Sequence, residues 1–242
     1  MLSLERQNEL REEYRKINPG WRPATEVYAD LVRAHLPPDA KVLDLGCGRG
    51  GLVEQLEHPL AQIAGVDPDE LSLREHRLAL PRAAAMSDGL PFAADSFDVV
   101  FASWLLEHLE RPLSTFSQIS RVLKPGGVFI FITPNTRHPL SALNRGLGQF
   151  SQLQGRLVKR FYGRAEGDAF PTFYRANSET AMGSLCRECN LEVSELQLIP
   201  DPTYLAFNQA FFKFMIWFDD KLAGKRQLHM VGCLLANPPN SE

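Results

Sequence analysis

Apolar positions along the chain fall into short continuous runs, separated by longer stretches in which apolar and polar residues alternate with a helical period. The helical spacing predicts helices over 1–17, 21–36, 112–123 and 178–189. Runs that are apolar throughout are typical of strands covered on both faces of a parallel sheet. The runs predict six strands, over 42–45, 62–67, 83–86, 97–103, 128–133 and 228–236, and an alternating pattern predicts a seventh, half-exposed strand over 191–199. We therefore expect an α/β fold with a mostly parallel sheet and helices on both faces.

The first strand ends in a glycine-rich segment, KVLDLGCGRGG, at residues 41–51. Glycines allow the backbone to turn sharply and to approach a ligand that a Cβ would keep away. The sequence GLVEQLEH that follows predicts the start of a helix, whose N-terminal N–H groups attract negative or polar groups. The segment therefore predicts a nucleotide-type site.

Two cofactors fit this segment, and a glycine turn without a ligand is the third alternative. The dinucleotide pattern G-x-G-x-x-G, with an acid about 20 residues later, fits Gly46, Gly48, Gly51 and Asp67. An acid-x-G-x-G-x-G pattern fits Asp44, Gly46, Gly48 and Gly50, and it resembles the loop of class I S-adenosylmethionine methyltransferases. A carboxylate at position 44 repels a pyrophosphate and attracts an ammonium or a sulfonium. Asp44 therefore favours S-adenosylmethionine.

Two further segments carry the same resemblance, which spans about residues 40–135. SDGLPFAADSFDVVFAS and RVLKPGGVFIFITPN are similar to the methyltransferase group that includes the ubiquinone and menaquinone biosynthesis enzymes. The resemblance implies a Rossmann-like fold, with an antiparallel last strand and helical insertions in the C-terminal half. It also implies that Asp88 accepts a hydrogen bond from the adenine amino group, with Gly89 beside the ring. Asp67 would hold the ribose hydroxyls in either nucleotide reading. The alternatives are a helix cap for Asp67 and a simple turn for Asp88-Gly89.

The reacting centre is expected where the strand 97–103 ends, because ligands bind at the carboxyl edge of a parallel sheet. Ser103 would face the cofactor and Trp104 the substrate. His108 is the candidate base if the acceptor must lose a proton, although a lone histidine is often an ordinary packed residue. Related enzymes place substrate contacts near Tyr174 and Arg175.

The second half of the chain predicts two elements that select the acceptor. Residues 134–176 form a long insertion, with seven Lys/Arg against two acids between Asn135 and Arg175. Such an insertion is typical of a lid that meets anionic groups, or is a solvated loop. Residues 203–222 form an apolar helix with an aromatic stripe at Tyr204, Phe207, Phe211, Phe214 and Phe218. This helix could be packed on the domain, or serve as a lid, a dimer face or an in-plane membrane helix.

Length, net charge and cysteine content limit the number of domains and the kinds of partner that we expect. The 242 residues suit a single domain 1–242, with N-terminal helices over 1–36 and a cofactor-binding core over 40–133. A net charge of −3 gives no reason to expect nucleic acid. Cys186-x-x-Cys189 is a single pair without a histidine cluster, so we expect packing and no metal site. The charged N-terminus does not resemble a signal peptide, and a cytoplasmic protein is expected, with peripheral membrane contact as an option.

These observations predict an S-adenosylmethionine-dependent methyltransferase. Its acceptor would be a small or lipophilic molecule, either a quinone-type ring or a lipid-linked or saccharide-linked compound. Two alternatives remain, which are an NAD-dependent oxidoreductase and a non-catalytic interaction module on the same fold. Against the oxidoreductase, the sequence contains no recognisable hydride-transfer site. Against the non-catalytic module, a site without activity would have no physical need to keep Asp44, Asp67 and Asp88.

Overall fold

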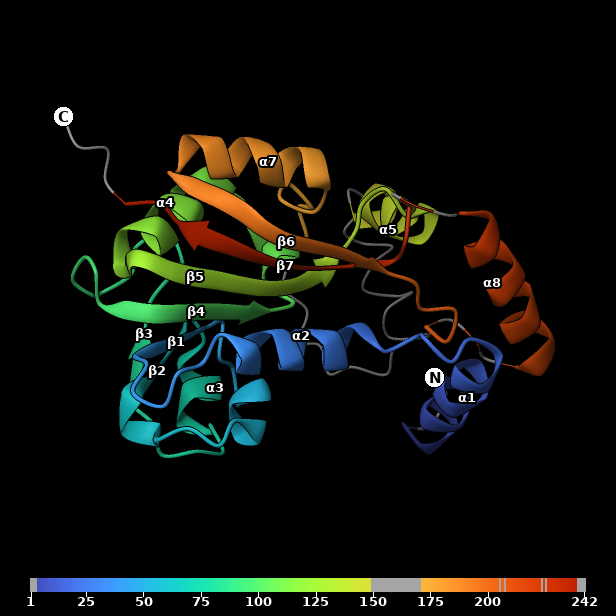
Figure 1. Cartoon of the computed structure of the whole chain (residues 1–242), viewed down its shortest axis with the longest axis horizontal. Helices are drawn as coiled ribbons and strands as arrows, with labels where there is room; N and C mark the ends of the chain where they lie inside the picture. The colour runs from blue at the N-terminus through green and yellow to red at the C-terminus, as the bar shows by residue number, and fades with distance from the viewer. Residues whose placement is uncertain are drawn as a thin grey trace.

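A seven-stranded sheet forms the centre of the computed structural model, which describes residues 4–148, 171–204, 206, 208–222, 224 and 226–238 (Figure 1). The strand order is β3-β2-β1-β4-β5-β7-β6. The strands are β1 (Val42–Leu45), β2 (Ile63–Asp67), β3 (Arg82–Ala84), β4 (Phe97–Ser103), β5 (Leu123–Pro134), β6 (Leu191–Ile199) and β7 (His229–Ala236).

All pairs from β3 to β5 are parallel, whereas β7 runs antiparallel to both β5 and β6. Leu45 of β1 lies opposite Val66 of β2 and Ala102 of β4, so these three strands end at one edge. This arrangement confirms the predicted mostly parallel, Rossmann-like sheet with an antiparallel last strand. The glycine segment, the acid after β2 and Ser103 consequently lie along the same carboxyl edge.

Helices cover both faces of the sheet. The helices α4 (Pro112–Val122) and α7 (Glu179–Glu188) lie on one face, and α2 (Ala24–Ala34) lies on the other (Figure 1). The short α3 (Glu70–Arg74) packs beside β2 and β3. Side chains of β5 alternate between the two cores, since Phe129 and Phe131 pack with α4 and α7, while Ile130 and Ile132 pack with α2. This alternation explains why β5 is apolar at consecutive positions.

The helices α1 (Leu4–Ile17) and α8 (Gln209–Lys221) pair at one end of the molecule, beyond the sheet edge that carries the glycine segment (Figure 1). A small separate core joins them, made of Leu10, Tyr14, Trp21, Ala206 and Phe212. The side chain of Gln209 donates a hydrogen bond to Glu13 over 2.6 Å. The helix α5 (Pro139–Gly148) lies near this end, within a stretch that the sequence pattern predicted to be irregular.

Several predicted helices are shorter than the sequence suggested. The helix expected after the glycines is one 3-10 turn, Leu52–Gln55, which ends where Leu56 adopts an extended conformation. Two further 3-10 turns are Leu60–Gln62 and Leu106–His108. The helix α8 begins after Asn208, whose side chain accepts the Phe211 amide as a cap, and not at residue 203 as predicted.

The aromatic residues of α8 divide between a buried side and an exposed side. Phe212 and Met215 are buried, while Phe214 and Trp217 are 48% and 56% exposed. The buried side shares a core with α1, so the helix is packed on the molecule along one side and leaves aromatic rings exposed along the other. Phe207 and most of the basic insertion, residues 149–170, lie outside the described residues.

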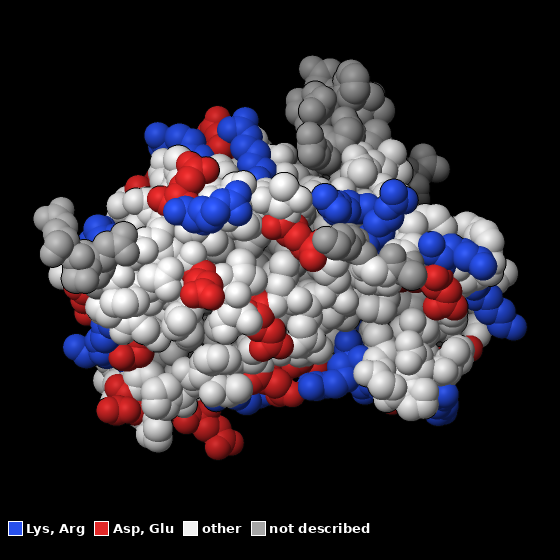
Figure 2. All heavy atoms as spheres, turned by 45° about the horizontal axis from the view of Figure 1, so that its top comes forward, with Lys and Arg blue, Asp and Glu red and all other residues white. Residues whose placement is uncertain are grey.

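The surface carries both signs of charge. On the face shown in Figure 2, Lys and Arg side chains are interspersed with Asp and Glu, without a broad area of one sign. None of the helices in the described ranges has the length and apolar character that a membrane span requires.

Candidate functional site

The glycine segment forms a tight loop directly after β1. Gly46, Gly48 and Gly50 have φ angles of +79°, +48° and +111°, a region that residues with a Cβ seldom adopt. The Gly46 amide donates to the Val66 carbonyl over 2.8 Å, which holds the loop against β2. A Cβ on Gly48 would meet nothing within 4 Å, so this part of the loop is open to an approaching ligand.

Asp67, at the end of β2, ties this loop to the neighbouring strand. One carboxylate oxygen accepts the Gly48 amide over 3.0 Å, and the other accepts the Asp69 amide over 2.9 Å. The helix cap predicted as an alternative belongs instead to Asp69, whose side chain accepts the Leu71 amide. Asp67 is half-buried, so its carboxylate lies at the surface of the site while it orders the loop.

Asp44 is a buried carboxylate beside the same loop. It is 5% exposed, and burial together with the charge of Asp67 raises its pKa to about 7. Among the described residues, no cation or hydrogen-bond donor pairs with this carboxylate. In the described part of the chain the Tyr28 hydroxyl of α2 is also buried without a hydrogen-bond partner, and its burial, with a smaller contribution from the charge of Asp44, raises its pKa. Two buried polar groups without partners thus lie near one another, as is expected where a polar or cationic ligand binds.

A cavity of about 350 Å³ lies between α2 and the end of the glycine loop. Its lining includes Tyr28 of α2, Gly51 and Leu52 after the glycines, and Ser103 at the end of β4. Arg22, which precedes α2, also lines it. The helix α2 therefore covers the carboxyl edge of the sheet. Trp21 instead belongs to the core between α1 and α8.

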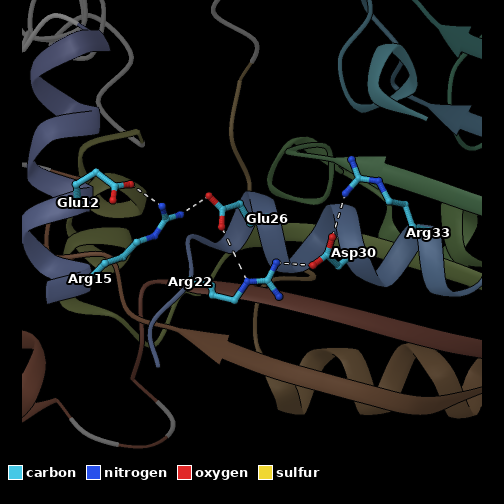
Figure 3. A network of polar contacts seen from close by, with 6 residues as sticks. All are labelled: Glu12, Arg15, Arg22, Glu26, Asp30 and Arg33. Atoms are coloured by element: carbon cyan, nitrogen blue, oxygen red, sulfur yellow. Dashed lines mark hydrogen bonds and ion pairs between the residues drawn. The ribbon is translucent and has the colours of Figure 1, made fainter. Parts of the chain in front are cut away.

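A row of alternating charges fixes α2 to α1 above this cavity (Figure 3). Arg15 of α1 pairs with Glu12 and with Glu26 of α2. Farther along, Arg22 pairs with Asp30, which also pairs with Arg33 over 3.0 Å. These side chains are about one-third or more exposed, so water and salt screen each pair and it contributes little to stability. Their arrangement places the Arg22 guanidinium at the rim of the cavity.

Asp88 and Gly89 lie in a loop after β3 that is close to Asp67. The Ala85 amide donates to the Asp67 carbonyl over 3.3 Å, so the predicted ribose and adenine residues share one edge of the site. Gly89 closes a turn by donating its amide to the Met86 carbonyl over 3.1 Å. Asp88 accepts a hydrogen bond from Arg111 over 2.6 Å, a contact that the sequence gave no means to predict.

The segment after β4 holds the predicted reacting side chains. Trp104 adopts a φ of +56°, a costly conformation for a bulky residue. Its ring contacts His229 edge-on, with the ring centroids 5.1 Å apart. His108 is half-buried, and its Nδ1 lies 2.9 Å from the Pro171 carbonyl. Nδ1 therefore carries the proton in the neutral ring, which leaves Nε2 as the basic nitrogen.

Glu107 joins this segment to the chain that follows the insertion. Its carboxyl is buried, which raises its pKa, and it accepts the Thr133 hydroxyl over 3.0 Å. Its backbone carbonyl accepts the amides of Phe173 and Tyr174 over 2.7 and 3.1 Å. The structure thus brings Tyr174 next to the 3-10 turn that bears His108. Arg175 donates to the Glu110 carbonyl from an exposed position.

A buried polar cluster lies where β7 begins, and the sequence analysis missed it. His138 contacts Asp219 of α8 over 3.4 Å, and His229 lies 4.0 Å from Asp201. All four side chains are at most 8% exposed. The four residues come from distant parts of the chain, so no local sequence motif indicates that they form a cluster.

The four cysteine side chains are packed in the interior of the protein. All four cysteines are free and buried, and burial raises the pKa of Cys47 to about 12 and that of Cys186 to about 11. Thiols with such pKa values are poor nucleophiles at neutral pH. Within the described ranges, no three His, Cys, Asp or Glu side chains gather as a metal site would need.

Comparison with known proteins places this geometry in context. Residues 43–131 match the family model described as a methyltransferase domain. A ubiquinone biosynthesis O-methyltransferase from Nitrosospira multiformis is 29% identical over 210 residues, which cover 81% of this chain and 82% of the relative. YodH of Bacillus subtilis, an uncharacterized methyltransferase, is 35% identical over 119 residues, 46% of this chain and 51% of YodH. The chain thus spans only about half the length of YodH.

A solved structure shares the fold. It is a geranyl diphosphate C-methyltransferase from Streptomyces coelicolor, in complex with Mg2+, geranyl diphosphate and S-adenosyl-L-homocysteine. The two chains superpose with a TM-score of 0.57 at 17% identity, over 87% of this chain and 77% of the other. At 17% sequence identity, this structural similarity shows a shared fold alone.

The sheet with its antiparallel last strand, the glycine loop and the acid after β2 define a Rossmann-like nucleotide-binding enzyme. With the family match, the chain is a class I S-adenosylmethionine-dependent methyltransferase. Its cofactor is accordingly S-adenosylmethionine.

Proposed function

We propose that the protein transfers a methyl group from S-adenosylmethionine to a small lipophilic acceptor. The observation that carries the proposal is the buried Asp44 carboxylate, which has no partner among the described residues and lies beside the unpaired Tyr28 hydroxyl. An ammonium group next to Asp44 would neutralise the carboxylate, and the hydroxyl of Tyr28 would gain a hydrogen-bond partner. A pyrophosphate at this place would meet a negative charge.

The glycine loop and the neighbouring cavity suggest where each part of the cofactor is held. Asp44, Gly46, Gly48 and Gly50 of the loop region would hold the amino-acid end. Arg22, which lines the cavity, would meet its carboxylate. Asp67 would accept the ribose hydroxyls, which must share its oxygens with the Gly48 and Asp69 amides. Asp88 and Gly89 would receive the adenine. Ser103 lines the cavity between these parts.

Bound S-adenosylmethionine supplies an electrophilic methyl carbon and a good leaving group. The acceptor forms a bond to that carbon while the carbon–sulfur bond breaks and its electron pair stays on sulfur. The protein mainly aligns the acceptor, and good alignment can be worth about 7–11 kcal/mol. For a hydroxyl acceptor, Nε2 of His108 would receive the proton, because the Pro171 carbonyl holds the Nδ1 proton. Trp104 and Tyr174 would form walls of the acceptor site.

Aromatic rings between the sheet edge and α8 support a lipophilic acceptor. The Trp104 ring contacts His229, which contacts Tyr204 at 6.0 Å. On α8, Phe214 contacts Trp217 and Phe218 at 5.8 and 6.0 Å. The relatives named as ubiquinone biosynthesis O-methyltransferases make a phenol-like quinone precursor the first acceptor to test. The exposed rings of α8 would then contact the membrane surface in which such a compound resides.

A labelled-methyl transfer assay tests the proposal directly. The enzyme would be incubated with S-adenosylmethionine labelled in the methyl group and with lipid, water-soluble and protein fractions. The proposal predicts label in the lipid fraction, and label in protein alone would contradict the lipophilic acceptor. His108→Asn should lower the transfer rate by about a hundredfold if a proton must be removed, without changing cofactor affinity. An unchanged rate would remove the base role.

The rival oxidoreductase predicts nicotinamide binding, which calorimetry with NAD measures. A non-catalytic module predicts no transfer with any fraction despite cofactor binding. The two rivals thus differ from the proposal in measurable ways.

A further inference from the structure

The loop that carries Asp88 is attached to one helix, α4, by three separate side-chain contacts. Ser87 shares a hydrogen bond with Thr115 over 3.0 Å. Arg121 donates to the Leu90 and Phe92 carbonyls over 3.0 and 2.7 Å. Arg111 donates to Asp88 over 2.6 Å. The Ser87 contact joins two side-chain hydroxyls, and Arg121 holds backbone carbonyls of the loop, whereas the Arg111 contact reaches the carboxylate itself.

The Asp88–Arg111 contact has an unusual distribution of exposure. The Asp88 side chain is 19% exposed, whereas the Arg111 side chain is 72% exposed. Arg111 immediately precedes α4 but forms no side-chain cap of it, so its guanidinium is not needed to begin the helix. The contact therefore acts mainly on the carboxylate of Asp88.

Arg111 occupies one oxygen of that carboxylate. The hydrogen bond ends on Oδ2, and Oδ1 has no partner among the described residues. A charge-assisted bond of this kind restricts rotation of the carboxylate. Oδ1 is then the oxygen available to accept a hydrogen bond from a ligand.

We propose that Arg111 is a positioning residue for the adenine of the cofactor, acting through Asp88. It holds Oδ2 so that Oδ1 is presented to the 6-amino group before the cofactor arrives. Pre-organisation of this kind raises affinity because less side-chain freedom is lost on binding. The inference rests on the proposed role of Asp88, and it adds a residue from a different element that selects for the amino group.

Calorimetry with two ligands tests the inference. The first is S-adenosylhomocysteine, and the second is its analogue in which purine without the 6-amino group replaces adenine. Arg111→Met removes the charge and keeps most of the side-chain stem. It should weaken binding of S-adenosylhomocysteine about three- to fivefold, the range of an exposed ion pair, and leave the purine analogue within about 1.5-fold. Arg111→Lys should recover part of the loss.

Matched variants separate this role from others. Arg74→Met removes an arginine whose ion pair with Glu70 is 78% and 69% exposed, and it should change neither affinity. An equal loss for both ligands in Arg111→Met would indicate a general structural effect and overturn the inference. Unchanged or tighter binding of S-adenosylhomocysteine would also overturn it.

If the proposed function is wrong, the binding measurements should differ from those expected when only the role of Arg111 is wrong. Asp88→Asn should weaken S-adenosylhomocysteine more than Arg111→Met does. If Asp88→Asn binds both ligands as the wild type does, the adenine role of Asp88 and the inference fall together. If the wild type binds neither ligand at millimolar concentration, the proposed function itself is wrong.

Discussion

At the scale of single residues, Asp44 carries most of the functional argument. The sequence identified it through its place two residues before the glycines, and charge alone made it favour a cationic ligand. Only the structure reveals its burial, the nearby Tyr28 hydroxyl and the pKa of about 7. These depend on α2, which folds over the loop from another part of the chain.

The raised pKa of Asp44 makes cofactor affinity depend on pH. Below pH 7 the carboxyl is mostly protonated and must lose its proton to meet a cation, so affinity should rise as pH increases. We expect S-adenosylmethionine to bind about fivefold more tightly at pH 7 than at pH 6, because the ionised fraction of a carboxyl with a pKa of about 7 rises by that factor. Calorimetry at several pH values measures this dependence, and Asp44→Asn should bind weakly with a nearly flat profile. A flat wild-type profile would contradict the assignment.

The free energy of unfolding should depend on pH in the opposite direction to cofactor affinity. Because the folded Asp44 carboxyl holds its proton up to about pH 7, the unfolding free energy should fall as pH rises from about 4 to 7. Above pH 7 this contribution no longer changes. Thermal melts of the wild type and Asp44→Asn would reveal the difference.

Asp67 offers a second residue-scale prediction. Asp67→Ala removes the proposed ribose acceptor and also the bond to the Gly48 amide. Both losses should weaken S-adenosylmethionine binding by at least about tenfold, since hydrogen bonds to a charged group are worth about 1.5–3 kcal/mol. Asp69→Ala, which removes the α3 cap next door, is the control. If Asp67→Ala bound the cofactor as tightly as the wild type, its ribose role would be excluded.

At the scale of elements, strand positions were predicted well and helix limits were not. Strands that are buried on both faces need continuous apolar runs, so β4 was placed to the residue. The half-exposed β6 was also placed to the residue, because its apolar and polar residues alternate. Helix limits depend on caps and neighbours, as Asn208 of α8 illustrates. The orientation of α8 also escaped prediction, because α1 covers the side that carries Phe212.

The exposed rings of α8 lead to an element-scale prediction. Trp217→Glu should reduce recovery of the protein with floating anionic liposomes several-fold, because it places a charge on the surface that would contact lipid. Leu113→Glu changes a side chain on α4 that is 46% exposed, and it should have no effect. If both variants and the wild type remain in the soluble fraction, the membrane contact is wrong. Dimerisation of the wild type that Trp217→Glu abolishes would assign the face to a second copy instead.

At the scale of the whole molecule, the sequence predicted the class of fold and the edge that carries the site. It did so because the order of strands fixes which loops meet at the carboxyl edge of a parallel sheet. The sequence did not predict contacts between segments that are distant along the chain. The pairing of Arg111 with Asp88 and the buried cluster around His229 and Asp219 are examples, since each joins residues that no local pattern connects.

The central claim is that the glycine loop, Asp44 and the roof formed by α2 bind S-adenosylmethionine. Calorimetric titration of the purified protein with S-adenosylmethionine at pH 7.5, alongside an identical titration with NAD, tests it most directly. The structure predicts saturable binding of S-adenosylmethionine at one site per chain, and no heat of binding with NAD. Absence of S-adenosylmethionine binding at millimolar concentration, or binding of NAD in its place, would contradict the account.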